Sequence, residues 1–391
     1  MQLDRFDLIV VGGGLVGASL ARAARGLSVA LIARERRIAG ASAPQGAFDS
    51  RIYAISPGNV AFLRELKAWQ AIPEARLTPV YGMRVFGDDG SAALEFDAYR
   101  AGAAELAWIV EDGALQDALW RSLDGRDGLE ILAPAECERV ELRAEDARMR
   151  LRDGRELHAC LVAGADGARS FVREQAGIDA TEHGYSQTAV VANFACERAH
   201  RNVAYQWFQG GPVLALLPLP GDHVSMVWSS ADVQAERLLA LDAAALCGEV
   251  EAASKGALGA LSLVGAARGF PLRRLKARRL VAPRVALVGD AAHVVHPLAG
   301  QGANLGFQDA RELAEVLAAR EPVRDPGDVR LLRRYERARA EPVLAMSATV
   351  DGLFRLFGTQ NGAFVQLRNA GLSLTDRIPP LKNMLMRHAM G

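Results

Sequence analysis

The chain of 391 residues lacks the features that mark several large classes of protein. Its four cysteines, Cys137, Cys160, Cys196 and Cys247, stand far apart, with no C-x-x-C pair and no histidine at metal-ligand spacing. We therefore expect neither a disulfide framework nor a metal site, and this cysteine usage fits a reducing cytoplasm.

An excess of one charge and long apolar runs are also missing. Lys plus Arg and Asp plus Glu number 46 each, so no overall field favours nucleic acid or an acidic partner. No stretch approaches the roughly 18 uninterrupted apolar residues of a membrane-spanning helix, and the amino terminus enters a strand pattern without a signal-peptide pattern. We expect a cytoplasmic protein that binds no nucleic acid, with two interleaved domains.

A glycine-rich turn near the amino terminus predicts a dinucleotide site. Gly12, Gly14 and Gly17 have the G-x-G-x-x-G spacing. The flanking strand, helix and second strand are predicted at Phe6–Val11, Leu15–Arg25 and Ser28–Ile32. The first glycine permits the tight turn, the second lets a pyrophosphate approach, and the third lets helix and strand pack closely. Leu15 and Val16 then begin a helix whose free N–H groups favour phosphate.

The acidic residue that binds the adenosine ribose is displaced in this chain. By count from the glycines, Glu35 is in range, whereas the position at the strand end holds Ala33. We predict Glu35 as the ribose ligand. The alternative is that Glu35 is a solvated loop charge and that Arg34 lies near the adenine.

Polar residues in the middle of the chain have two readings each. Arg51 either pairs with a phosphate or forms a surface ion pair, and Gln116 either contacts the ligand or is solvated. Asp166, which follows a short strand at Leu161–Ala163, either lies at the ligand edge of a parallel sheet or caps the next helix. Arg169 serves either a phosphate or the surface.

Alternating and apolar segments from about residue 181 to 270 predict an antiparallel sheet, followed by helix over about Ala231–Lys255. Six apolar side chains of this sheet are candidates for lining a substrate pocket: Trp207, Phe208, Leu214, Leu216, Val227 and Trp228. We expect most of them to pack in the core and only a minority to touch substrate.

The segment GDAAHVVHPLAGQGANLG, residues 289–306, predicts a bed for a flat anionic ring. Asp290 follows the strand Val285–Val288 and can accept hydrogen bonds from a sugar or ribityl chain. The compact loop Pro297–Gly302 leaves room for a ring, and the helix Ala303–Ala319 points its positive end at that ring. His293 and His296 are either general bases or, more in keeping with the pattern, packing residues.

Taken together, GGGLVG, GADGARS and GDAAHVVHPLAGQGANLG resemble the motifs of class A flavoprotein aromatic monooxygenases. SRIYAISPGNVAFLRELKAW, VEDGALQDAL and HPLAGQGANLGFQDARELAEVL are similar to segments of the ubiquinone-biosynthesis hydroxylases. The 2-octaprenyl-6-methoxyphenol hydroxylase branch is the most similar in pattern. The resemblance covers nearly the whole chain. One departure is VEDG, where the group often has VENR, which puts contacts near Asp112 and Gly113 in doubt.

The resemblance implies an α/β fold like that of para-hydroxybenzoate hydroxylase. It has a Rossmann-like FAD-binding domain (1–75, 101–180 and 271–340), an inserted substrate domain (76–100 and 181–270) and a C-terminal helical region (341–391). The implied FAD contacts are Gly12, Gly14, Leu15, Val16, Gly17, Glu35, Arg51, Gln116, Asp166, Asp290, Pro297, Gly300, Gln301, Gly302, Ala303 and Asn304. Chemistry is centred on the flavin, and His296 and Pro297 are only weak catalytic candidates.

The implied reaction is hydroxylation of a polyprenylated phenol by a flavin C4a-hydroperoxide formed from O2 after NAD(P)H reduces FAD. Three alternatives stay open: a hydroxylase of another small aromatic, a geranylgeranyl-type reductase, and a non-enzymatic FAD-bound scaffold in a quinone-synthesis complex. Arg368, Arg377, Lys382 and Arg387 lie among apolar residues near the C-terminus, with Asp376 as the acid, and this pattern suggests either peripheral membrane contact or a packing helix.

Overall fold

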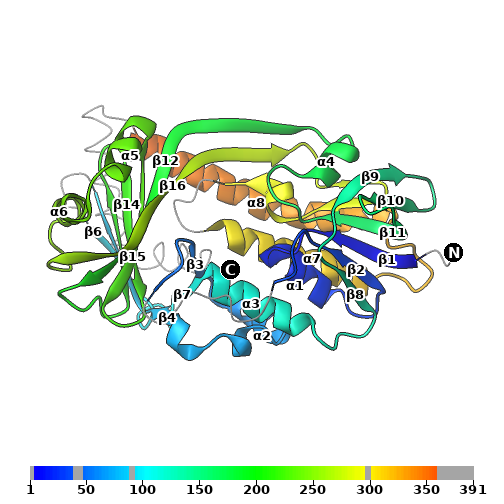
Figure 1. The fold of residues 1–391 in the computed structure, drawn as a ribbon, viewed down its shortest axis with the longest axis horizontal. Coiled ribbons are helices and arrows are strands. Elements are labelled where there is room, and N and C mark those ends of the chain that lie inside the picture. Colours follow the sequence, from blue (N-terminus) through cyan, green and yellow to red (C-terminus); the bar gives the residue numbers. More distant parts are fainter. Residues whose placement is uncertain (1–3, 38–46, 88–92, 296–300, 359–391) are drawn as a thin grey trace.

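The computed structural model describes residues 4–37, 47–87, 93–295 and 301–358. Two eight-stranded sheets and a three-stranded sheet organise this part of the chain. Figure 1 shows the two larger sheets at opposite ends of an elongated molecule. The α-helices are α1 (Leu15–Ala23), α2 (Pro57–Glu65), α3 (Asp112–Leu123), α4 (Phe171–Gln175), α5 (Asp232–Leu239), α6 (Ala243–Ala253), α7 (Gln301–Ala318) and α8 (Val329–Gly358).

The first sheet contains a parallel core that begins with the predicted amino-terminal strand. Its strands are β1 (Asp4–Val11), β2 (Val29–Ile32), β8 (Leu129–Leu132), β9 (Cys137–Leu142), β10 (Ala147–Leu151), β11 (Glu156–Gly164), β17 (Val281–Ala282) and β18 (Val285–Leu287). The order is β17-β18-β11-β1-β2-β8, with β10 beside β11 and β9 beside β10. Leu8 and Val10 point into a core shared with α1, α3, α7 and α8, while Ile9 and Val11 pack under β9 and β10. Burial on both faces explains why residues 8–11 of β1 form a continuous apolar run.

The second sheet forms the other end of the molecule. Its strands, in order across the sheet, are β19 (His293–Val294), β16 (Leu261–Ala277), β12 (Ala180–Cys196), β15 (His223–Ala231), β14 (Val213–Leu219), β13 (Val203–Phe208), β5 (Gly82–Phe86) and β6 (Ala93–Asp97). The small sheet is β3 (Ile52–Ile55), β7 (Ala107–Glu111) and β4 (Leu77–Val80), and the short 3₁₀ helices are η1 (Trp69–Ala71), η2 (Glu74–Arg76) and η3 (Gly289–Ala291).

The prediction of a purely antiparallel second sheet is wrong at one pair, because β13 runs parallel to β5 with Val203 opposite Gly82. The two strands are far apart in the chain, so no hairpin restricts their relative direction.

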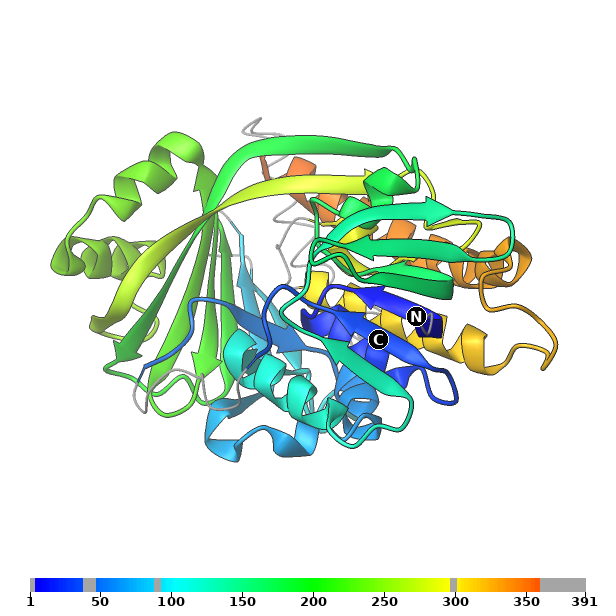
Figure 2. The ribbon, with the colours of Figure 1, turned by 45° about the vertical axis from the view of Figure 1, so that its right-hand side comes forward.

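Two strands of 17 residues, β12 and β16, connect the sheets. They pair from Ala180–Ala277 to Cys196–Leu261, and Figures 1 and 2 show them as an arch across the top of the molecule. The predicted boundary at 180/181 falls at the start of β12 and that at 270/271 falls inside β16. The division into domains therefore stays a prediction.

Several predicted element boundaries are corrected. The helix expected over Ala231–Lys255 is two helices, because Asp242 caps a new helix by accepting a hydrogen bond from Ala245 N at 2.8 Å. The pattern from Pro57 also predicts a helix to about Trp69, but α2 ends at Glu65, followed closely by Lys67 with φ 61°. The apolar periodicity continues past these points and therefore predicts longer helices. The chain ends the helices because a capping side chain in one case, and a residue with left-handed backbone in the other, interrupts the helical hydrogen bonding.

Further boundary differences are smaller. The strand expected at Leu161–Ala163 is the nine-residue β11, and α7 begins at Gln301, two residues before the expected start. Over the described residues, no helix combines the length and apolar character required to cross a bilayer.

Candidate functional site

The turn between β1 and α1 requires glycine for the reasons that its spacing predicts. Gly12 has φ +113°, and a Cβ there would lie 2.3 Å from the Ala165 carbonyl oxygen. A Cβ on Gly17 would lie 1.9 Å from the Gly12 carbonyl oxygen, so α1 packs directly on the turn. Gly14 faces open space, with no atom within 4 Å of its would-be Cβ. This geometry leaves room for a phosphate beside the second glycine.

The amino terminus of α1 has the donors that a pyrophosphate needs. Gly14 is the N-cap and supplies no capping side chain, so the first N–H groups of α1 point outward without a side-chain acceptor. Leu15 is buried in the core. The Val16 side chain packs against Gly289 and Gly306 so closely that a Cβ on either glycine would lie 3.0 or 2.4 Å from Val16 Cγ2. Leu15 and Val16 can therefore meet a ligand only through their backbones, and the turn fits the diphosphate of FAD.

The three predicted motifs meet at one edge of the first sheet. Val11, Gly164 and Leu287 stand in register at the carboxyl ends of β1, β11 and β18. The residues that follow them, Gly12, Asp166 and Asp290, therefore leave the sheet side by side, where ligands bind in open α/β sheets.

Asp166 takes the capping role that the sequence left as an alternative. Its carboxylate accepts hydrogen bonds from Ser170 Oγ at 2.5 Å and from Val172 N at 3.1 Å, at the start of α4. Arg173, which the sequence did not single out, donates to the Ala291 carbonyl oxygen at 2.9 Å and joins α4 to η3. Contact of Asp166 with a cofactor remains a prediction.

Asp290 follows β18 and lies in the short helix η3. Its side chain is exposed, yet limited hydration by the surrounding protein raises the pKa of its carboxyl. The charge of Arg51 opposes this rise, which places Arg51 near the same carboxyl. Arg51 also lies over the ring of Phe270, 5.3 Å from its centre. The structure thus brings Arg51 and Asp290 together from opposite halves of the chain.

Gln116 is held in place by two charged neighbours. Its side-chain nitrogen donates to both Asp112 carboxylate oxygens at 3.0 Å, and its carbonyl oxygen accepts from Arg37 Nη1 at 3.0 Å. Tyr53 donates to the same Asp112 carboxylate at 3.1 Å. Burial and the negative charge of Asp112 raise the pKa of Tyr53, so its hydroxyl stays protonated. The interaction of Gln116 with FAD is still a prediction.

Arg37 also explains the glycine in VEDG. A Cβ on Gly113 would lie 2.6 Å from Asp49 Oδ2 and 3.2 Å from Arg37 Nη2. Arg37 reaches α3 from the segment after β2 and pairs with the fully buried Asp117 at 2.8 Å. Sequence reasoning missed Arg37 because its partners lie about 80 positions away.

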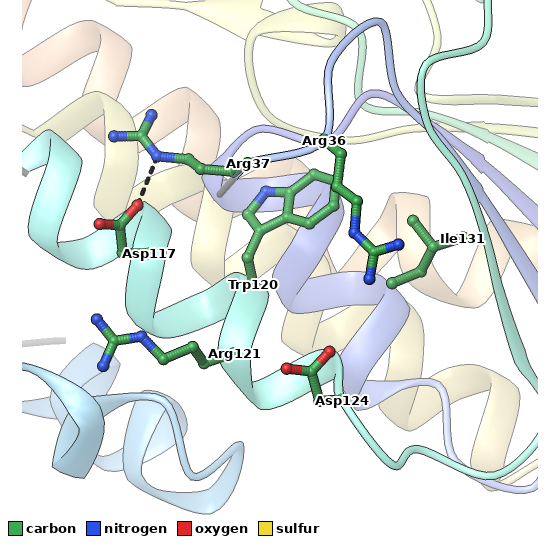
Figure 3. A pocket seen from close by; sticks show the side chains of 7 residues that line it. All are labelled: Arg36, Arg37, Asp117, Trp120, Arg121, Asp124 and Ile131. Carbon is green, nitrogen blue, oxygen red and sulfur yellow. Dashed lines mark hydrogen bonds and ion pairs between the residues drawn. The ribbon is translucent and has the colours of Figure 1, made fainter. Parts of the chain in front are cut away.

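Arg37 is one of several charged side chains that line a cavity of about 250 Å³ beside the glycine turn. Figure 3 shows Trp120 between Arg36 and Arg37, with Arg121 and Asp124 further along α3. Trp120 Nε1 donates to the Gly13 carbonyl oxygen at 2.9 Å and ties this cavity to the turn.

The expected ribose carboxylate has no counterpart at the end of β2. Ala33 is buried there, and its Cβ lies 2.7 Å from the would-be Cβ of Gly13. Glu35 is exposed, and Arg34 pairs with Glu136 at 3.6 Å. Glu35 as the ribose ligand stays a prediction.

The start of α7 is locked to the small sheet. The buried Asn304 side chain accepts hydrogen bonds from Ser56 N and Asn59 Nδ2, at 3.0 and 2.9 Å, and donates to the Ala54 carbonyl oxygen at 2.8 Å. Gly302 and Ala303 lie in the first turn of α7, as does Gln301, the first helical residue. The candidates His296, Pro297 and Gly300 lie outside the described residues.

His293 has a buried structural partner. Its Nε2 lies 2.7 Å from Asp309 Oδ2, and both side chains are buried. Asp309 also accepts hydrogen bonds from Arg339 Nε at 2.6 Å and Gly289 N at 2.9 Å. Burial alone would lower the pKa of His293, but the Asp309 carboxylate outweighs it and raises that pKa. This network joins α7, α8 and η3.

The second sheet has one covered face and one face turned toward the cofactor candidates. Trp207, Leu214, Leu216 and Trp228 pack under α5 and α6. Of the predicted pocket residues, Phe208 and Val227 have the opposite strand parity and lie on the other face. That face looks toward the first sheet in Figures 1 and 2.

The fold and the glycine turn define a dinucleotide-binding oxidoreductase. Residues 5–349 match the FAD binding domain family. The chain is 37% identical over 388 residues to the ubiquinone hydroxylase UbiL of Rhodospirillum rubrum, covering 98% of this chain and 89% of that protein. It is 32% identical over 390 residues to the 3-demethoxyubiquinol 3-hydroxylase of Escherichia coli, covering 98% of each.

The fold of p-nitrophenol 4-monooxygenase PnpA from Pseudomonas putida is also similar, with a TM-score of 0.79 at 19% identity and coverage of 100% of this chain and 99% of that one. The chain belongs to the FAD-binding family of ubiquinone-biosynthesis hydroxylases. It is an FAD-dependent monooxygenase, and the predicted fold class and cofactor are confirmed.

Proposed function

We propose that the chain hydroxylates the aromatic ring of a polyprenylated phenol in ubiquinone biosynthesis, with O2 as the oxygen source and NAD(P)H as the electron donor. The observation that carries this proposal is the match over 98% of the chain to a ubiquinone hydroxylase. The open turn at Gly14 and the exposed carboxylate of Asp290 support it, because they suit the diphosphate and the ribityl chain of FAD.

Bound FAD supplies hydride acceptance from a nicotinamide and activation of O2. The residues of the chain bind, orient and exclude water. The N–H groups at the start of α1 would hold the diphosphate, and Asp290 would accept hydrogen bonds from ribityl hydroxyls. Arg51 would add positive charge near Asp290, and the start of α7 would favour negative charge on a bound ring. No side-chain nucleophile is needed.

Purified protein loaded with FAD tests the reaction. A prenylated phenol is expected to accelerate oxidation of NADH or NADPH and to give a product that carries one ¹⁸O atom from ¹⁸O2. Activity on small phenols alone would favour a different aromatic hydroxylase, and loss of a prenyl double bond would favour a reductase. Bound flavin that no nicotinamide reduces would favour the scaffold. A folded protein that takes up no flavin would refute the proposal.

The ring position and the 2-octaprenyl-6-methoxyphenol branch are finer parts of the proposal. A strain without this gene should accumulate the quinone precursor that lacks one ring hydroxyl, and the substitution pattern of that precursor identifies the step. Accumulation of a fully hydroxylated precursor would contradict a role in ring hydroxylation.

We also propose peripheral contact with the inner face of the membrane, because the substrate is lipophilic. Arg368, Arg377, Lys382 and Arg387 interleaved with apolar residues support it, although this segment lies outside the described residues. Protein truncated after residue 360 should lose binding to vesicles that contain anionic lipid and keep its FAD. Unchanged vesicle binding would refute this contact.

A further inference from the structure

Two buried polar groups on the second sheet lack partners, on the face that looks toward the cofactor candidates. On β15, the even-numbered residues Val224, Met226 and Trp228 pack under α5 and α6. Ser225 has the opposite parity, so its side chain lies on the other face of the sheet. Asn193 of β12 stands directly opposite Ser225 in the antiparallel pair, so both side chains project from the same face.

This face is less tightly closed than the covered one. Ala215, Leu217 and Val227 are only half-buried although they lie on β14 and β15, which have neighbours on both sides. On the covered face of the same strands, Leu214 and Met226 are fully buried. Part of each of these three apolar side chains therefore stays exposed on this face.

The orientation of the Asn193 amide follows from its neighbours. Its Nδ2 faces two carbonyl oxygens, those of Asp49 at 3.1 Å and Phe48 at 3.4 Å. Two acceptors require the nitrogen on that side, so Oδ1 points away from them. Asn193 is 5% exposed, and Oδ1 has no hydrogen-bond donor among the described residues.

Ser225 is the second unpaired group. It is fully buried, and no partner for its Oγ occurs in the described parts of the chain. A buried amide oxygen or hydroxyl without a partner costs about 1–3 kcal/mol. One acceptor and one hydroxyl, side by side, form a complementary pair for a ligand with an O–H donor next to a second oxygen.

A hydrogen bond and two short stretches of chain connect Asn193 and Ser225 to the predicted cofactor residue Arg51. Asn193 holds the backbone of Asp49, and two residues later Arg51 lies over Phe270 with its charge acting on Asp290. Phe270 pairs with Ala189 on β12, four residues before Asn193 and on the same face. The unpaired atoms thus lie near the segment that carries Arg51.

We propose that Asn193 and Ser225 recognise the oxygen substituents of the substrate ring. Asn193 Oδ1 accepts the phenolic O–H, and Ser225 Oγ donates to the neighbouring ring oxygen. Two hydrogen bonds to adjacent substituents fix the rotation of the ring in its plane, which decides the carbon presented for hydroxylation. This inference rests on the proposed function, because it assumes a phenolic substrate.

The sharpest test compares Ser225→Ala with Ser230→Ala. Ser230 is on the same strand, is also fully buried and also has an unpaired Oγ within the described residues, but has the parity of the face under α5 and α6. Ser225→Ala should weaken phenol binding about tenfold, the factor that corresponds to 1.4 kcal/mol, and should lower the product formed per NAD(P)H oxidised. Ser230→Ala should change neither quantity.

Stability separates recognition from a structural role. Removal of an unpaired hydroxyl should leave the melting temperature equal or higher in both variants, so weaker phenol binding by Ser225→Ala would not reflect unfolding. Asn193→Leu should weaken phenol binding further, with anisole as the probe that lacks the O–H. Because anisole cannot donate to Oδ1, the preference of the wild-type protein for phenol over anisole should disappear in Asn193→Leu.

Equilibrium binding, followed by the change in flavin absorbance, distinguishes the two levels of the proposal. Phenol binding without turnover would contradict the proposed function and still report on Ser225. Equal phenol affinity of the wild-type protein and Ser225→Ala, as expected if these atoms only hold water, would overturn the recognition pair. Wild-type protein that binds FAD and no phenol would overturn both.

Discussion

Replacement of Asp309 by Asn tests the network that supports the region after β18. Asp309 is fully buried and accepts hydrogen bonds from His293, Gly289 and Arg339, at 2.7, 2.9 and 2.6 Å. Asn has nearly the same shape, so Asp309→Asn removes the charge and leaves the volume. Arg339 is 5% exposed and would lose the carboxylate that balances its charge.

Loss of one member of a buried ion pair costs about 3–5 kcal/mol, because the remaining charge stays away from water. For a chain of this length, that loss corresponds to a fall in melting temperature of about 4–6 °C. An exposed pair provides the scale for comparison. Glu321 and Arg334 are 49% and 42% exposed, so Glu321→Gln should lower the melting temperature much less than Asp309→Asn.

Two measurements on heating test this prediction. The rise in fluorescence of released FAD gives the temperature of cofactor loss, and the loss of circular dichroism gives the temperature of unfolding. Asp309→Asn should release FAD at a lower temperature, because Gly289 precedes Asp290 and is anchored by the same carboxylate. Asp309→Leu combined with Arg339→Met should recover much of the loss, since both charges are then absent. An Asp309→Asn variant that unfolds and releases FAD within 1 °C of the wild-type temperature would refute this reasoning.

The pH dependence follows from the directions of the two pKa shifts. Burial alone would raise the pKa of Asp309, but the charges of His293 and Arg339 outweigh it and lower that pKa. Its contribution is thus present above about pH 3.9 and is lost as the pH falls through the lowered value. The raised pKa of His293 has the opposite sense: its contribution is present below about pH 6.5 and is lost as the pH rises through the raised value. The stability difference between wild type and Asp309→Asn should be largest between these limits, and a difference independent of pH would contradict the assignment.

Two further predictions concern the cofactor end. Gly17→Ala should weaken FAD binding at least tenfold and lower the melting temperature, because its Cβ would lie 1.9 Å from the Gly12 carbonyl oxygen. Gly248→Ala in the exposed face of α6, where no atom lies within 4 Å, should instead stabilise by about 0.5–1 kcal/mol; similar behaviour of both variants would contradict close packing at Gly17. Arg37→Ala should weaken FAD binding and lower the melting temperature by releasing Gln116 and leaving the buried Asp117 without this ion pair, whereas Arg36→Ala, which changes an exposed side chain, should have a smaller effect on stability. Titration of the apo-protein with FAD measures the affinity of the Gly17 and Arg37 variants. Equal effects of Arg37→Ala and Arg36→Ala would refute the positioning role of Arg37.

Local rules made the glycine turn predictable. The roles of Gly12, Gly14 and Gly17 depend on backbone neighbours a few residues away, and the structure shows the contacts that the spacing requires. The meeting of the motifs after β1, β11 and β18 was predictable as well, because parallel strands end at one edge of a sheet. The capping role of Asp166 was visible only as one of two readings, since a carboxylate before a helix suits either.

Side-chain partners across the molecule were not predictable in the same way. Arg37 reaches Gln116 and Asp117 on α3, and Asn193 turns its amide oxygen away from the two carbonyl groups that hold its nitrogen. His293 looked like a candidate base until its partner Asp309 was placed beside it. The amino-acid sequence by itself determined the FAD family, the phosphate turn and the sheet edge where the motifs meet, because these follow from backbone conformation over short distances. Only the tertiary structure decided which buried charges neutralise one another and which polar atoms stay free, because those outcomes depend on packing between segments that are far apart in the chain.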